Sequence, residues 1–273
     1  MLILCDVNPV HRIRRPVVTW ALIVACVLAT LGFWQHMTSF WAWDTAGAWF
    51  PALMLHLLVH IDGWHLVGNL LVIWVFGDNV EDALGHARFA LFLIVTGLAA
   101  SFGEVLLSPT PVVILGASGM ASAIMGGYLL LHPLARIVVA FNPVPVWPMA
   151  FPATLVVVVF LLTNVVGLLF REAAQIAWSA HLIGFVLGVV LTFLLRTRGI
   201  PILQGPQSPE AILAGTGAVQ RRVFVSLDWL GGYHMHEGRH GERKAIEELC
   251  RRSFFDRFAL FVILVLFGEL LLG

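Results

Sequence analysis

The sequence has few charged residues and few cysteines. Only 12% of its 273 residues are charged and 59% are hydrophobic, whereas soluble domains carry roughly 25% charged residues. The 16 basic and 16 acidic residues balance, and no basic stripe with interleaved aromatic residues is present, so we predict no nucleic-acid partner. The cysteines lack a CxxC pair, which argues against a disulfide scaffold and a cysteine-based metal site; they are Cys5, Cys26 and Cys250. Such a composition is typical of a polytopic membrane protein.

Apolar runs predict an all-α polytopic fold with seven spans. We expect spans at 17–34, 63–76, 89–107, 112–131, 153–170, 176–195 and, after a polar segment, 254–272. A polar turn is expected at 77–88, and a proline-containing connection at 132–152 that cannot be helical throughout. No cleavable signal peptide is expected. The predicted regions are an N-terminal segment at 1–16, a six-helix core at 17–197, a polar segment at 198–253 and a seventh span within 254–273.

Basic residues predict the orientation of these spans. Of the 16 Lys and Arg residues, all but Arg171 fall in or beside loops on the same side as the N-terminus. Because cytoplasmic loops are enriched in Lys and Arg, we expect the N-terminus and residues 198–253 to be cytoplasmic. The second, fourth and sixth spans then enter the membrane from its outer side.

The stretch Leu115–Gly127, which reads LGASGMASAIMGG, is rich in small residues. Small residues let membrane helices approach closely, so Ser118 can be read as a packing residue. A second observation favours a catalytic role for Ser118. His181 lies in the apolar sixth span, and an ionisable residue there indicates a functional site. Together a Ser and a His suggest a nucleophile and its base.

Asn69 in the second span is predicted to lie at the same depth in the membrane as Ser118 and His181. Ser118, His181 and Asn69 lie five or six residues inside the predicted outer ends of their spans, which is about 8–9 Å at the ~1.5 Å rise of a helix. Asn69 and the nearby His65 can donate hydrogen bonds to an oxyanion. No Asp or Glu lies in the outer halves of these three spans, so the sequence predicts a Ser–His dyad open to the outer aqueous phase.

These residues resemble motifs of the rhomboid intramembrane serine proteases, over about residues 10–197. Gly116-Ala117-Ser118-Gly119 resembles the nucleophile motif, and AHLIGFVLG around His181 resembles AHxxGxxxG. HIDGWHLVGN resembles the second-span pattern of the family, with His60, His65 and Asn69. The resemblance implies a bacterial-type six-helix bundle with an extra C-terminal span, a serine endopeptidase in the bacterial plasma membrane, single-span transmembrane substrates and no cofactor or metal. It implies that Ser118 is the nucleophile and His181 the base, and that His65 and Asn69 bind the oxyanion. It implies structural roles near the site for six more residues: His60, Gly116, Gly119, Ser122, Gly184 and Gly188.

Two positions depart from the family pattern. Many bacterial members have a Tyr stacked on the catalytic His four residues after the nucleophile, where this chain has Ser122. Many also have a Trp-Arg pair in the first outer loop, and here Trp41-Ala42-Trp43-Asp44 lacks the Arg. The sequence therefore leaves open which group holds His181 in place.

Other classes of function remain alternatives. The 11 histidines are compatible with a transporter or a metal-binding membrane protein, although His65 and His181 have no acidic or Cys partner at their depth. The tract His234-Met235-His236-Glu237-Gly238-Arg239-His240 could bind a metal or be a solvated loop. A catalytically silent rhomboid-like binding protein is another alternative, although both Ser118 and His181 are present. An α/β-hydrolase is disfavoured, because the Ser motif is not G-x-S-x-G and no strand precedes it.

Overall fold

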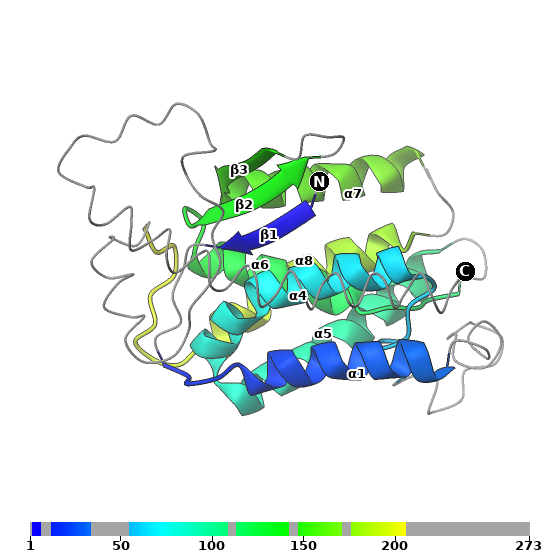
Figure 1. Cartoon of the computed structure of the whole chain (residues 1–273), viewed down its shortest axis with the longest axis horizontal. Coiled ribbons are helices and arrows are strands. Elements are labelled where there is room, and N and C mark those ends of the chain that lie inside the picture. Colours follow the sequence, from blue (N-terminus) through cyan, green and yellow to red (C-terminus); the bar gives the residue numbers. More distant parts are fainter. Residues whose placement is uncertain are drawn as a thin grey trace.

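The computed structural model describes residues 2–6, 12–33, 55–108, 113–141, 147–170 and 176–205. Within these ranges it contains six helices and a small sheet (Figure 1). The predicted seventh span, most of the segment 198–253 and the Trp-rich loop near Trp41 lie outside the described residues. The helices are α1 (Val17–Phe33), α4 (Gly63–Leu84), α5 (His86–Leu107), α6 (Ser118–Leu131), α7 (Ala153–Phe170) and α8 (Trp178–Leu195).

The helices confirm the predicted class of an all-α integral membrane protein. Helices α5, α7 and α8 are each long and apolar enough to cross a membrane, and α1 and α6 are shorter apolar helices. Helix α7 has the bounds predicted for it, and the bounds of α1, α5 and α8 differ from the predicted ones by one to three residues. On α7 many large apolar side chains point outward, as expected for a lipid-facing helix; they include Leu155, Leu162, Leu169 and Phe170.

Helix α4 is longer than predicted. It continues through residues 77–84, which are part of the polar turn expected at 77–88, and ends at Leu84, just before Gly85, whose φ of +81° suits glycine. The prediction of a turn was wrong because the polar side chains here have partners inside the protein and are buried. Asn79, for example, donates from Nδ2 to Asp6 Oδ2 at 2.8 Å, and Tyr128 donates its hydroxyl to the same oxygen at 2.8 Å.

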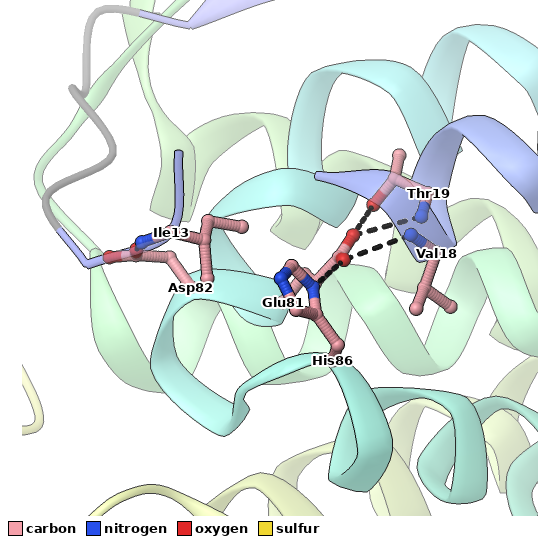
Figure 2. A network of polar contacts seen from close by, with 6 residues as sticks. All are labelled: Ile13, Val18, Thr19, Glu81, Asp82 and His86. Atoms are coloured by element: carbon pink, nitrogen blue, oxygen red, sulfur yellow. Dashed lines mark hydrogen bonds and ion pairs between the residues drawn. The ribbon is translucent and has the colours of Figure 1, made fainter. Parts of the chain in front are cut away.

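Glu81 is the centre of a polar network that fixes the start of α1 (Figure 2). Its fully buried carboxylate accepts the backbone N–H of Val18 at 2.9 Å and that of Thr19 at 2.8 Å, and the Thr19 hydroxyl at 2.6 Å. His86, the first residue of α5, lies 2.6 Å from the same carboxylate. The first turn of a helix has N–H groups without an intrahelical partner, and an anion there is favourable. The end of α4 thus caps α1.

Helix α6 lies in the middle of the bundle and pairs closely with α8. A Cβ built on Gly184 would overlap the carbonyl oxygen of Gly119, and one built on Gly188 would overlap that of Ala123. Glycine permits this approach because it has no side chain. From the first contact to the second, the residue number rises by four on both helices, so α6 and α8 run in the same direction.

A three-stranded antiparallel sheet, which the sequence did not predict, lies beside α7 (Figure 1). Its order is β1 (Leu2–Asp6), β2 (Arg136–Phe141) and β3 (Trp147–Pro152). Strands β2 and β3 form most of the predicted proline-containing connection, and β1 joins them from the N-terminal segment.

Segments predicted to share the N-terminal side of the membrane meet at one end of the bundle. Asp6 contacts the C-terminal parts of α4 and α6 through Asn79 and Tyr128. Beyond α8, Thr197 donates its N–H to Ala83 O at 2.9 Å and Leu203 donates to Leu130 O at 2.8 Å. The C-terminal ends of α4, α6 and α8 therefore lie at the same end of the bundle.

Candidate active site

Ser118 is the first residue of α6, at the opposite end of that helix from the sheet contacts. The fourth span was predicted to be helical from residue 112, and this was wrong, because residues 113–117 are not helical. Gly116 has a φ of +103°, which places a turn before the serine. The depth estimated for Ser118 from helical rise therefore does not apply. The first intrahelical bond runs from Ala121 N–H to Ala117 O at 2.8 Å, so the N–H groups of residues 118–120 have no partner within the helix.

His60 holds the turn in front of Ser118. Its Nδ1 lies 3.0 Å from Leu58 O, and its Nε2 lies 3.2 Å from the backbone N of Ala117. A carbonyl only accepts and an N–H only donates, so the ring must carry its proton on Nδ1. Burial lowers the pKa of His60 to about 3, which keeps the ring neutral. His60 therefore acts on the backbone beside Ser118, as a structural residue would.

His65 lies against the same turn. The N-terminus of α4 is capped by Asp62, which accepts the His65 backbone N–H at 2.7 Å, and this fixes the first turn that carries the ring. A Cβ built on Gly116 would lie 2.7 Å from His65 Cε1 and 3.1 Å from Nε2. The ring can approach the segment before Ser118 only because residue 116 is glycine.

Asn69 is one turn further along α4 and is buried. Its Nδ2 donates to His65 O at 3.0 Å. One of its two amide hydrogens is thus used within α4, and the other can serve a second acceptor.

His181 is in the first turn of α8, one turn before Gly184. The helix start is anchored by Glu104 of α5, whose Oε2 accepts the Ala180 N–H at 2.8 Å. Gly184 packs on Gly119, the residue that follows Ser118. Because α6 and α8 run in the same direction and Gly184 lies opposite Gly119, Ser118 and His181 are near the starts of adjacent helices, with His181 two residues before the position opposite Ser118.

Sequence reasoning missed Asn164. Its Oδ1 lies 2.7 Å from His181 Nδ1, and its Nδ2 donates to Phe160 O at 2.7 Å. The only signal in the sequence was one amide in the apolar run of α7. His56 was also missed: its carbonyl accepts the Gly116 N–H at 2.8 Å, and its Nε2 lies 2.8 Å from Ser101 Oγ.

Aromatic rings on α7 and α8 surround His181 where the family's Tyr is missing. Phe160 lies 6.1 Å from the His181 ring and Trp178 lies 6.2 Å from it, measured between centroids. Ser122 points elsewhere, since its hydroxyl donates to Ser118 O at 2.8 Å and is buried.

A metal site in the described part of the chain would need several His, Cys, Asp or Glu side chains close together. No group of three or more His, Cys, Asp or Glu residues there could hold a metal ion. The tract that contains His234, His236 and His240 lies outside the described ranges.

The bond from Ala117 to His60 gives a testable prediction. His60→Ala should lower the unfolding free energy by roughly 1–3 kcal/mol, because it leaves the buried Ala117 N–H without an acceptor. Unfolding in detergent, followed by heating or by SDS titration, measures the effect. His60→Gln, whose amide oxygen can accept that N–H, should recover part of the loss. Equal stability of His60→Ala and the wild type would show that this bond does not order the turn.

Comparison with known proteins gives a family match over the same region. The family model described as Rhomboid domain matches residues 45–198, which include α4 to α8 and every candidate site residue. Among curated relatives, YdcA of Bacillus subtilis, which is named for the rhomboid family, is 28% identical over 124 residues, or 42% of this chain and 62% of that protein. Rhomboid protein 1, mitochondrial, of Saccharomyces cerevisiae is 30% identical over 48% of this chain and 38% of its own length.

A third relative carries an activity in its name. Rhomboid protease GluP of Bacillus subtilis is 34% identical over 83 residues, which are 30% of this chain and 16% of that protein. In all three relatives the match spans less than two thirds of their own length.

Proposed function

This chain belongs to the rhomboid family, and from that premise we propose that it is an intramembrane serine endopeptidase with Ser118 as nucleophile and His181 as base. The observation that carries the proposal is the contact of Gly184 with Gly119. This contact sets the starts of α6 and α8 side by side, with a serine as the first residue of one helix and a histidine in the first turn of the other. A serine hydroxyl is a weak nucleophile until an adjacent base accepts its proton.

The reaction follows from these two groups. Ser118 Oγ attacks the scissile carbonyl carbon while His181 Nε2 takes the hydroxyl proton. The tetrahedral intermediate then breaks its C–N bond, and His181 returns the proton to the leaving amine. Water hydrolyses the acyl-enzyme by the same two steps, which frees Ser118 and releases the new carboxylate.

Donors for the oxyanion come from two helices. Because Ser118 starts α6, its backbone N–H lies at the positive end of that helix. The His65 ring lies against Gly116, and Asn69 has one amide hydrogen beyond the one bonded to His65 O. In this proposal the three groups bind the oxygen that becomes negative in the intermediate.

The proposed substrates are single-span membrane proteins. A peptide must be extended to reach Ser118, and backbone groups left unpaired in lipid cost several kcal/mol each. Spans with helix-breaking residues near their outer end and a small residue at the cut should therefore be preferred. We place the N-terminus in the cytoplasm and the site near the outer side of a bacterial plasma membrane, because the basic residues favour that orientation.

Covalent labelling tests the nucleophile directly. A serine-directed fluorophosphonate should label the purified protein in detergent. Ser118→Ala should not be labelled and His181→Ala should be labelled much more slowly, since its serine lacks a base. Ser122→Ala is the matched control and should label like the wild type. A wild-type protein that takes up no probe would instead support a catalytically silent membrane-protein-binding role or transport.

A further inference from the structure

We propose that Asn164 is a positioning residue for the base, holding His181 in the tautomer with its proton on Nδ1 and directing Nε2 toward Ser118. This inference rests on the proposed function, since it assigns the third member of that site. The juxtaposition that carries it is the 2.7 Å contact between Asn164 Oδ1 and His181 Nδ1.

The direction of this hydrogen bond is fixed by the other end of the amide. Asn164 Nδ2 lies 2.7 Å from Phe160 O, which is a carbonyl and can only accept. Turning the amide over would set two oxygens against each other at that distance. The amide oxygen must therefore face His181, and since this oxygen can only accept, His181 Nδ1 must be the donor.

The tautomer has a direct chemical consequence. A neutral imidazole with its proton on Nδ1 has its lone pair on Nε2. Only a nitrogen with a free lone pair can accept the serine proton. Among the described residues no carboxylate hydrogen-bonds the His181 ring, so the neutral amide of Asn164 has the orienting task that Asp performs in the Ser-His-Asp triad.

The surroundings of Asn164 make it a rigid support. The residue as a whole is 1% exposed, and the backbone carbonyl that its side chain bonds belongs to its own helix. One turn before it, Phe160 packs beside the His181 ring, and one turn after it, Gly167 makes room for the indole of Trp178. Trp178 also meets the His181 ring edge-on at 84°. The ring is thus held by one hydrogen bond and two aromatic neighbours, none of which comes from α6.

Kinetics of three variants test the inference. Asn164→Leu, which keeps the volume and removes the acceptor, should lower kcat about 10–100-fold with KM nearly unchanged, because a misplaced catalytic group costs up to about 10²-fold. Asn164→Asp keeps an acceptor for His181 Nδ1, and while its carboxyl is protonated its O–H can donate to Phe160 O in place of the amide, so this variant should recover more activity than Asn164→Leu. Thr163→Val is the matched control: the hydroxyl of Thr163 bonds Val159 O on the same helix, so this variant should be indistinguishable from the wild type.

A second readout does not depend on activity. In the ¹⁵N NMR spectrum of histidine-labelled protein, with His181→Gln used for assignment, His181 should show a protonated Nδ1 and a bare Nε2 at pH 8. Asn164→Leu should shift the ring toward a mixture of the two tautomers. A wild-type His181 with its proton on Nε2 would overturn the inference whatever the activity.

The outcomes separate this inference from the proposed function. A fixed Nδ1–H tautomer that is lost in Asn164→Leu, in a protein that neither cleaves nor labels, would support the positioning role and reject the protease. An Asn164→Leu variant with the rate, KM and His181 spectrum of the wild type would reject the positioning role and leave the protease standing.

Discussion

Ser118→Ala should abolish cleavage of a model transmembrane substrate without unfolding the protein. Removing the nucleophile of a serine protease lowers the rate about 10⁶-fold, which is below detection in a gel assay. The fold should be unaffected, because residue 118 is the first position of α6 and Ala is favourable in helices. The assay follows the size of the substrate in detergent or liposomes, with the melting temperature measured in parallel.

Ser122→Ala is the matched control for that experiment. Both serines are on α6 and Ser122 donates to Ser118 O at 2.8 Å, so both variants remove a hydroxyl from successive turns at the start of one helix. Only Ser118 is placed to attack a substrate in our proposal. Full cleavage by a folded Ser118→Ala protein would reject the serine-protease proposal, and loss of cleavage in both variants would point to a disturbed helix rather than a lost nucleophile.

Gly188→Ala should be the most destabilising single-methyl change in the described part of the chain. A Cβ at this position would overlap the backbone of Ala123 at its oxygen, its carbonyl carbon and its Cα. Backbone atoms cannot rotate away as a side chain can, so α8 must move off α6, and overpacking of this kind costs about 1–3 kcal/mol or more. The same shift would separate His181 from Ser118, so cleavage should fall together with stability.

Gly68→Ala is the control for Gly188→Ala. A Cβ on Gly68 of α4 meets no atom within 4 Å, so the same methyl group should cause no overlap. Since Ala is favoured over Gly in helices by about 0.5–1 kcal/mol, this variant should be as stable as the wild type or more so. Unfolding by SDS titration compares the two variants, and equal stability would mean that α6 and α8 are less tightly paired than their glycines indicate.

The sequence predicted the helices that are bounded by strong signals. Helix α7 follows a proline-containing stretch and consists of one apolar run, and its predicted bounds are confirmed. Helix α8 was predicted to within two residues at its start. In such cases length and apolar composition are sufficient to predict a helix. In lipid the backbone N–H and C=O groups of a single segment must bond one another, and a helix achieves this.

The sequence did not predict features that depend on contacts between distant segments. Residues 113–117 are as apolar as the helix that follows, and nothing in that composition shows that Gly116 has a positive φ. Polar residues at 77–84 indicated a turn, but Glu81 and Asn79 find their partners in α1 and β1. Asn164 likewise has no neighbouring motif, and its relation to His181 is visible only once α7 and α8 are packed together.

The capping of α1 by Glu81 has a consequence for the order of assembly during synthesis. The acceptor lies 63 residues further along the chain than the Val18 N–H that it binds. When α1 leaves the ribosome, its first-turn donors must therefore remain with water or lipid headgroups until α4 has been made. The N-terminus of α1 can thus be capped only after α4 has been synthesised. A ribosome stalled before residue 81 would leave α1 in the membrane without this cap.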